Sequence, residues 1–175
     1  VAYQNSNRSS SVFRDIFYML YQHFGQQARW QRSKFRFKMP VKLLDSTLVS
    51  LTMSVYDWAH YTTKKGAVKM HTLLDYDSLL PEFVNVTTGK TTDNKAAYDM
   101  PVAPHSVVVA DRGYCDYRLL EHWDSNKVFF VVRHKENMRY VSTEERPLPE
   151  KSAQNVLIDE VVELELPESK RKYRS

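Results

Sequence analysis

The chain has 175 residues, of which 42% are hydrophobic, with a formal net charge of +4 and a single cysteine. This length allows one domain with a sizeable core. There is no run of about eighteen apolar residues, so we expect no membrane span. The first ten residues lack the apolar region of a targeting signal, and we interpret them as a cut end. The lone Cys115 excludes an internal disulfide and favours a reducing compartment.

Basic residues are concentrated at both ends of the sequence. Residues 1–40 carry seven Lys or Arg and one acid, a local charge of +6, and the tail from Glu168 has a charge of +3. The middle therefore carries −5. Basic flanks around an acidic centre are typical of a polyanion-binding protein whose core gathers cations, although an ordinary solvated surface explains the charges equally well.

The first half of the sequence predicts a helix followed by three strands. In residues 7–25, apolar side chains recur at three- and four-residue steps after a serine cluster that can cap a helix, and Gly25 is a plausible stop. The next pattern is strand-like and runs through "VKLL" into Asp45. Two further strands, 67–74 and 82–87, are joined by the turn-like "DYDS".

The second half predicts alternating helices and strands. A short helix in "TTDNKAAYDM" precedes the most apolar strand, "HSVVVAD", which ends at Asp111. An amphipathic helix at 115–127 and the strand "KVFFVVRH" follow. The fold class is therefore α/β: a three-strand antiparallel meander with parallel strands and helices added, which is the element order of a ribonuclease H-like mixed sheet.

Composition suggests three regions. Residues 1–40 hold the N-terminal helix and a basic linker, and residues 41–138 hold the sheet. From 139 to 175 the sequence becomes polar, with one or two exposed strands and a basic end. We interpret this last region as the start of an inserted or following module.

Two predicted strands end in an aspartate, Asp45 and Asp111. Sites in open sheets form beyond the carboxyl ends of parallel strands, so these carboxylates would converge if the two strands are neighbours. Convergent carboxylates suit Mg²⁺ or Mn²⁺, and two such ions can promote phosphodiester chemistry. Gly113 would keep the turn after Asp111 slim and leave room for a nucleic-acid backbone.

Each candidate also has an ordinary structural explanation. Asp45 could belong to a cap or turn, and Asp111 could cap the helix that begins near residue 115. Lys64 and Lys65, in an aromatic stretch at 56–65, could touch phosphates beside stacked bases, or could simply be solvated.

Three stretches of the sequence resemble the catalytic domain of DDE-type transposases of bacterial insertion sequences, in the group typified by insertion sequence number four. These are "KLLDSTLVSL", "KKGAVKMHTLLD" and "VVVADRGYCDYRLLEHWDSNKVFFVVRHKEN". The resemblance implies a ribonuclease H-like domain that cleaves and transfers DNA strands, with three acids that bind two Mg²⁺ ions (Mn²⁺ can replace them). It matches Asp45 to the first acid, and Asp111 with Gly113 and Tyr114 to the second.

The family's third acid, a Glu in a helical Tyr-Arg-Glu-Lys-like block beyond a β-rich insertion, has no match here. Glu160, Glu163, Glu165 and Glu168 lie in strand-like or tail sequence, with no helical Tyr-Arg spacing before them. The resemblance therefore implies that 41–138 is an incomplete catalytic core and that 139–175 begins a truncated insertion. We expect this chain by itself to be inactive.

The resemblance also implies the partner and the place of action. DNA, as element ends and as target, is the expected partner, and the parent protein could act as a dimer on it in the bacterial cytoplasm, associated with the nucleoid. Candidate DNA contacts are Lys64, Lys65, Arg112 and Tyr114. The main alternative is a non-catalytic nucleic-acid-binding module of the same fold. A weaker one is a phosphohydrolase on a doubly wound sheet with Asp45 as nucleophile.

Overall fold

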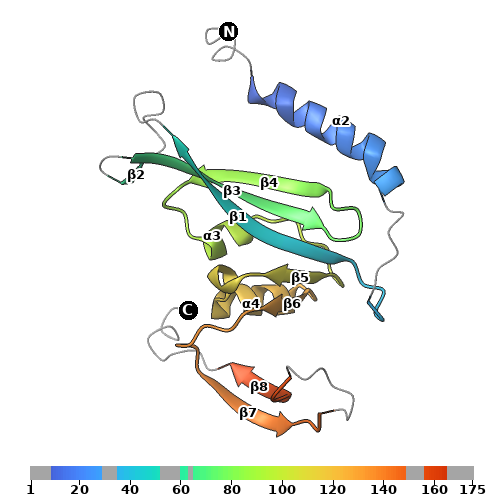
Figure 1. Ribbon diagram of the computed structural model, residues 1–175, viewed down its shortest axis with the longest axis vertical. Coiled ribbons are helices and arrows are strands. Elements are labelled where there is room, and N and C mark those ends of the chain that lie inside the picture. The colour runs from blue at the N-terminus through green and yellow to red at the C-terminus, as the bar shows by residue number, and fades with distance from the viewer. Residues whose placement is uncertain (1–8, 29–34, 52–59, 63–64, 149–155, 165–175) are drawn as a thin grey trace. The chain divides into compact units, whose positions relative to one another are not determined.

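The computed structural model describes residues 9–28, 35–51, 60–62, 65–148 and 156–164 (Figure 1). The chain divides into two compact units, Val1–Val132 and Arg133–Ser175. The first unit holds the main sheet, and the second holds a two-stranded sheet. The predicted boundaries after residues 40 and 138 stay predictions.

The N-terminal helix, α2, spans Ser10–Ala28. Ser9 Oγ accepts a hydrogen bond from the backbone N of Ser11 at 3.3 Å, so the serine cluster caps the helix as predicted. The predicted stop at Gly25 is wrong, because the helix continues beyond it. A glycine inside a helix costs only about 1 kcal/mol relative to alanine, which the rest of the helix can offset.

Antiparallel pairing builds one half of the main sheet. The strands β1 (Val41–Leu51), β3 (Lys65–Asp75) and β4 (Pro81–Thr88) form the predicted meander, with β3 in the middle. A short strand that the sequence did not predict, β2 (His60–Thr62), pairs with the beginning of β3.

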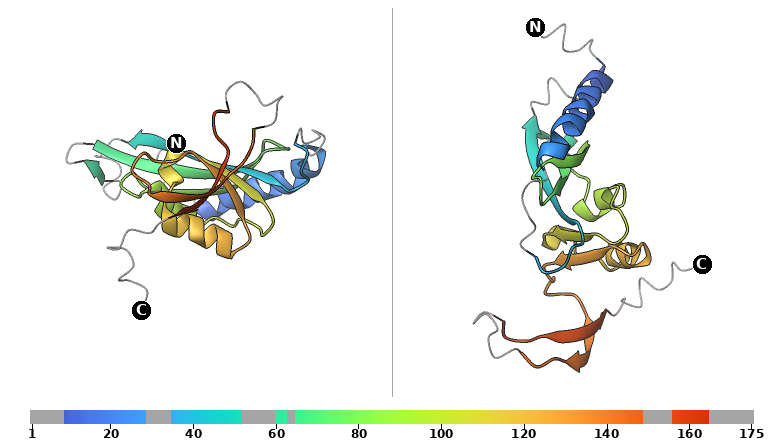
Figure 2. Two further views of the ribbon diagram at one scale, coloured as in Figure 1. Left: turned by 90° about the horizontal axis from the view of Figure 1, so that it is seen from below. Right: turned by 90° about the vertical axis from the view of Figure 1, so that its right-hand side faces the viewer.

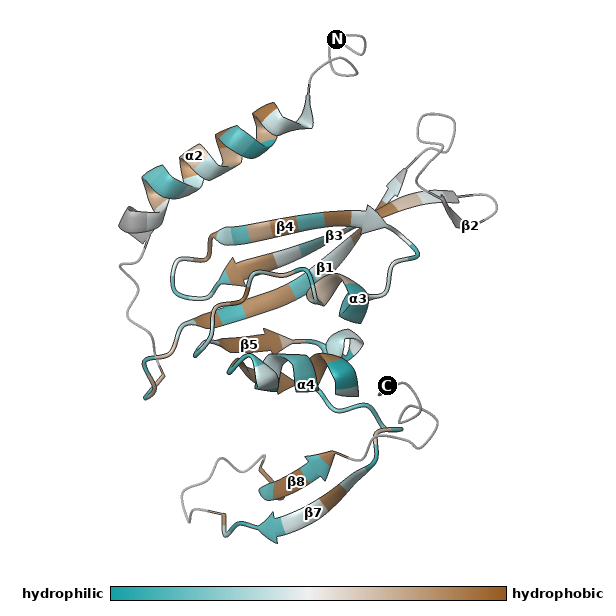
Figure 3. Cartoon of the chain, turned by 180° about the vertical axis from the view of Figure 1, so that it is seen from behind, coloured by the Kyte–Doolittle hydropathy of each residue, from teal (hydrophilic) through white to brown (hydrophobic). Residues whose placement is uncertain are grey.

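Parallel pairing builds the other half. Strand β5 (Val107–Ala110) lies beside β1, and β6 (Phe129–Val132) lies beside β5, both parallel to their neighbours. The apolar run of β5 (brown in Figure 3) fits this central place, and Val108 is completely buried. The fold is thus the predicted α/β, ribonuclease H-like mixed sheet. It excludes the doubly wound parallel sheet that the phosphohydrolase alternative requires.

Two helices make the crossovers that lead into the parallel strands. Helix α3 (Asp93–Ala97) precedes β5, and α4 (Tyr117–Ser125) connects β5 to β6. Both lie on one face of the sheet (Figure 2), as expected when successive right-handed crossovers advance in the same direction. Their apolar sides close the core, where Leu119 and Trp123 of α4 are buried.

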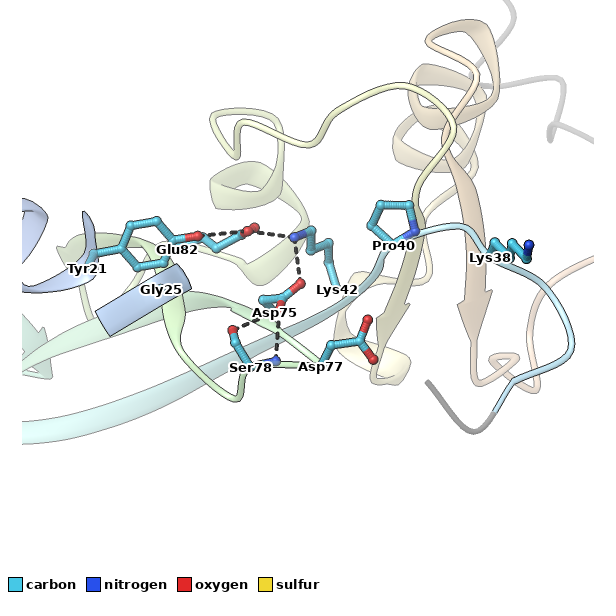
Figure 4. Close-up of a pocket in the computed structure, with 9 residues that line it drawn as sticks. All are labelled: Tyr21, Gly25, Lys38, Pro40, Lys42, Asp75, Asp77, Ser78 and Glu82. Atoms are coloured by element: carbon cyan, nitrogen blue, oxygen red, sulfur yellow. Dashed lines mark hydrogen bonds and ion pairs between the residues drawn. The ribbon is translucent and has the colours of Figure 1, made fainter. Parts of the chain in front are cut away.

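A partly buried ion-pair cluster joins the start of β1 to the antiparallel strands (Figure 4). Lys42 Nζ lies 2.9 Å from Asp75 Oδ1 and 2.6 Å from Glu82 Oε1. Tyr21 Oη of α2 donates to the same Glu82 oxygen at 3.0 Å. This cluster ties β1, β3, β4 and α2 together beside a cavity of about 350 Å³.

The second unit contains β7 (Tyr140–Glu145) and β8 (Glu160–Leu164), paired antiparallel. Strand β8 lies in the stretch predicted to form exposed strands, whereas β7 was not predicted, since its residues "YVSTEE" are mostly polar and exposed. Within the described ranges, no helix is long and apolar enough to span a membrane.

Candidate metal centre

The register of β1 and β5 brings Asp45 and Asp111 to the same level of the sheet. Parallel pairing ends at Leu44 opposite Ala110, and each aspartate is the next residue on its strand. The prediction that these two strands are parallel neighbours is therefore confirmed. Neighbouring strands lie about 4.8 Å apart, so both aspartates start from adjacent backbone positions. Both are exposed.

Asp45 does not end its strand, as the sequence analysis expected. Strand β1 continues to Leu51 because β3 carries the antiparallel ladder past the point where β5 stops, with Asp45 opposite Thr72. The cap or turn explanation for Asp45 is thereby excluded. A regular strand, held on one side by β3, fixes the backbone of this acid.

Asp111 begins the short 3₁₀ turn η1 (Arg112–Tyr114). Its Oδ1 accepts a hydrogen bond from Gly113 N at 2.7 Å. Asp111 is thus the N-cap of this 3₁₀ turn and not, as the alternative expected, of the helix that follows, because Asp116 caps α4 through the backbone N of Arg118 and Leu119. The single backbone hydrogen bond to Asp111 leaves acceptor capacity on its carboxylate, which has about four lone-pair sites.

A third acid, Asp93 in the first turn of α3, lies at the same end of the sheet. Its Oδ1 accepts hydrogen bonds from Ser46 Oγ at 2.8 Å and from Lys69 Nζ at 3.2 Å. Nδ1 of the buried His71 lies 3.7 Å from the same oxygen. Sequence reasoning did not single out Asp93, because an acid at a helix start is common as a cap residue.

Gly113 allows two of these acids to approach each other. A Cβ added to this glycine would lie 2.9 Å from Asp111 Oδ1 and 2.9 Å from Asp93 Oδ2. The two oxygens are therefore separated by no more than twice that distance. The glycine is needed for space and not for its backbone angles, since no glycine among the described residues has positive φ. The predicted slim turn after Asp111 is thus found, and an acid fills the space.

Two buried polar atoms at this place have no hydrogen-bond partner. They are His71 Nδ1 and Tyr114 Oη, on side chains that are 0% and 1% exposed. Burial raises the pKa of Tyr114, and the charges of Asp93, Asp45 and Asp111 raise it further. The Ser46 hydroxyl acts on that pKa in the opposite direction, but it does not complete a hydrogen bond of ordinary geometry with Oη. Tyr114 therefore stays a neutral phenol with a proton to donate.

The charges of the cluster do not balance. Burial lowers the pKa of His71, and of its charged neighbours Asp93 acts to raise it and Lys69 to lower it, so the imidazole stays neutral near pH 7. Lys69 is paired with Asp93, and with Arg112 beside Asp111 the site holds two cations against three carboxylates, from Asp45, Asp93 and Asp111. Surplus negative charge at one end of a sheet attracts cations.

This set of groups fits a hydrated Mg²⁺ or Mn²⁺ ion. In the part of the chain that the structure describes, no three His, Cys, Asp or Glu side chains are grouped so that they could hold a metal ion. Mg²⁺ commonly takes only one or two carboxylates and keeps several waters. The unpartnered Tyr114 and His71 atoms are the kind of groups that ordered water satisfies.

The residues predicted to contact DNA lie in different places. Lys64 lies outside the described residues, and Lys65 begins β3. Arg112 is exposed beside Asp111. Tyr114 is buried, which leaves no surface for DNA, so we assign its side chain to the interior of the site and not to DNA contact.

These features define a ribonuclease H-like domain with acids at the point where the ladder between two adjacent parallel strands ends. Residues 36–173 match the family described as the transposase DDE domain. The chain belongs to this family, so the resemblance seen in the sequence is confirmed.

The names of two bacterial relatives also describe transposases. The chain is 30% identical over 134 residues to y4zB of Sinorhizobium fredii, provisionally named a transposase, which covers 77% of this chain and 36% of the relative. It is also 31% identical over 110 residues to the protein assigned to insertion sequence element IS5377 of Geobacillus stearothermophilus. This second alignment covers 63% of this chain and 29% of the relative. The chain thus spans about a third of the length of the curated relatives it matches.

Proposed function

We propose that the chain is part of a transposase that cuts DNA at element ends and joins the freed 3′-hydroxyls to a target. Family membership supports a DNA transposase. One observation supports particular residues: Asp45 and Asp111 lie at the same level of two adjacent parallel strands. Two carboxylates on fixed backbone, just past the last parallel pair of β1 and β5, suit phosphodiester chemistry that depends on a divalent ion.

In this proposal, Asp45 and Asp111 hold Mg²⁺ or Mn²⁺, and the chain's other groups shape its surroundings. A bound ion would activate the attacking water or hydroxyl and stabilise the leaving oxygen. Gly113, which has no side chain, lets the carboxylates of Asp111 and Asp93 lie close together. Neutral Tyr114 adds no further negative charge among the acids. Water in cleavage and the DNA 3′-hydroxyl in joining would attack phosphorus in line, without a covalent enzyme intermediate.

We further propose that the 175-residue chain by itself binds the ion weakly and does not cleave DNA. Two carboxylates offset the dehydration of Mg²⁺ poorly, and no residue of the sequence matches the family's third acid. The family also suggests the partner, which is DNA, and we propose that Arg112 is one of the residues that contact it. The parent protein would act as a dimer on DNA, in the bacterial cytoplasm near the nucleoid.

Mn²⁺ binding to the purified chain tests the centre directly, through loss of the electron paramagnetic resonance signal of free Mn²⁺. We expect Asp45→Asn and Asp111→Asn each to weaken binding at least about tenfold. The matched control is Asp99→Asn, an exposed acid just beyond α3 with the same charge change. If all three variants bind Mn²⁺ as the unaltered chain does, the centre does not exist.

A plasmid assay tests the inactivity of the chain. The chain is incubated with supercoiled plasmid and Mn²⁺, beside the Asp111→Asn variant. We expect no cleavage by either. Cleavage by the unaltered chain that disappears in the variant would show that a further ligand completes the centre.

The second candidate is a non-catalytic nucleic-acid-binding module of the same fold, favoured by the basic first 40 residues. It keeps DNA binding but predicts no loss of Mn²⁺ affinity in Asp45→Asn or Asp111→Asn. The same titration therefore separates the two candidates.

A further inference from the structure

We propose that Asp93 is a positioning residue of the metal centre, which receives hydrogen bonds from water bound to the ion that Asp45 and Asp111 hold. The inference rests on the proposed function and extends it to an acid that the sequence did not single out. Asp93 belongs to α3, a separate element from the strands that carry the other two acids. It would therefore link the crossover helix to the centre.

The orientation of the Asp93 carboxylate is the first argument. Its Oδ1 is occupied by Ser46 and Lys69, which fixes the plane of the group. Its Oδ2 and Asp111 Oδ1 each lie 2.9 Å from the position that a Cβ of Gly113 would take. Among the described residues no three acidic or imidazole side chains are grouped to hold one ion, so we assign Asp93 to a water on the ion and not to the ion itself.

The unpartnered buried atoms are the second and independent argument. His71 Nδ1 lies 3.7 Å from Asp93 Oδ1, too far for a hydrogen bond. Tyr114 Oη is buried in the same 3₁₀ turn that Asp111 caps. Leaving a buried polar atom without a partner is unfavourable, so two such atoms beside the acids point to a water or ion site.

Lys69 supplies a test that separates this role from a merely structural one. Its Nζ is paired with Asp93 at 3.2 Å, and its side chain is 18% exposed. If Asp93 only holds α3 to β3, loss of either partner should reduce stability and leave metal affinity alone. If Asp93 serves the ion, removing its charge weakens Mn²⁺ binding, whereas removing the competing cation strengthens it.

The experiment measures Mn²⁺ affinity and thermal unfolding of the 175-residue chain and four variants. Asp93→Asn removes the charge and keeps the shape, with an oxygen that can still accept from Ser46 and Lys69. Lys69→Met removes the cation and keeps the length of the side chain. Asp99→Asn is the matched charge control, and Asp111→Asn reports on the centre itself.

We expect Asp93→Asn to weaken Mn²⁺ binding roughly tenfold, Lys69→Met to strengthen it severalfold, and Asp99→Asn to change it by less than about twofold. If Asp93→Asn behaves as Asp99→Asn does while Asp111→Asn still weakens binding, the inference fails and the proposed function stands. If Asp111→Asn also binds Mn²⁺ normally, the proposed function fails. Should Asp93→Asn not fold, Lys69→Met decides: tighter binding supports the role of Asp93, and unchanged binding overturns it.

Discussion

Gly113 is the residue on which the spacing of the acids depends. It has no side chain at a position that two carboxylate oxygens both approach, and its backbone angles make no demand for glycine. The constraint is therefore one of volume. Any side chain here displaces the carboxylate of Asp111 or of Asp93.

Gly113→Ala tests this constraint. An added methyl group would lie 2.9 Å from both oxygens, closer than real contacts allow, so we expect Mn²⁺ affinity to fall about tenfold. The control is Gly25→Ala in α2, where nothing lies within 4 Å of the added carbon. That change should raise the free energy of unfolding by about 0.5–1 kcal/mol and leave Mn²⁺ binding alone. Normal Mn²⁺ binding by Gly113→Ala would refute the close packing of the acids.

The hydroxyl of Tyr114 gives a second prediction at this scale. Because Oη is buried without a protein partner, Tyr114→Phe should leave the free energy of unfolding of the metal-free chain unchanged or raise it by about 1 kcal/mol. Urea denaturation in the presence of a chelator measures this. A loss of about 1.5 kcal/mol or more would instead mean that Ser46 and Tyr114 share a hydrogen bond in solution.

The sequence predicted Asp45 and Asp111 but not Asp93, for a physical reason. The first two follow apolar strand patterns, and an acid after such a run stands out locally. Asp93 stands in a polar cap sequence where an acid is ordinary, and its importance arises only when α3 places it against Gly113 and Lys69. This contact depends on how the crossover through α3 folds, and local sequence patterns do not show that.

At the scale of elements, β1 combines two pairings that end at different places. Its parallel ladder with β5 stops at Leu44, whereas its antiparallel ladder with β3 runs to Leu51. The sequence predicted the strand and its neighbours correctly, since the apolar run and the element order are local signals. The end of β1 was predicted at Asp45, because the sequence of β1 does not show how long its partner strand is.

The ion-pair cluster at the start of β1 should contribute substantially to stability. Lys42 is the cation between Asp75 and Glu82, and its side chain is only 11% exposed. Lys42→Met would leave two partly buried carboxylates facing each other, and we expect the free energy of unfolding to fall by about 2–3 kcal/mol. The nearby exposed Lys38→Met should change it by less than about 0.5 kcal/mol. An equal effect of the two substitutions, measured by urea denaturation, would contradict the role of the cluster.

The same cluster predicts how stability depends on pH. Burial acts to raise the pKa of Asp75, but hydrogen bonds from Lys42 and Ser78 outweigh it, so the net pKa is lowered in the folded state. The unfolded chain then binds the proton more readily, and the stabilisation is present above the ordinary Asp pKa of about 4 and is lost as pH falls below it. Urea unfolding between pH 7 and pH 3 should show this loss, and Lys42→Met should reduce it. An identical slope in the variant would exclude Asp75 as its source.

At the scale of the whole molecule, charge is segregated along the chain. The net +4 combines basic ends of +6 and +3 with a middle of −5 that contains the three acids of the centre. A phosphate backbone is attracted by the ends and repelled by the middle unless cations are bound there. DNA affinity and metal binding therefore draw on different parts of the chain and should be separable.

We expect the purified chain to bind duplex DNA in the presence of a chelator, with an affinity that falls linearly with salt concentration on logarithmic axes. Each phosphate neutralised by a basic side chain releases counterions and contributes about 0.9 to the slope. Replacement by glutamine of the four basic residues of the tail, Lys170, Arg171, Lys172 and Arg174, should reduce the slope by up to about 3.6 if all four contact phosphates. Asp45→Asn and Asp111→Asn should leave the slope unchanged, because they remove acids and no phosphate contact. Fluorescence anisotropy with a labelled duplex measures both quantities. A salt-independent affinity, or no binding at low salt, would show that the basic ends are ordinary solvated surface and that DNA must be recognised by other means.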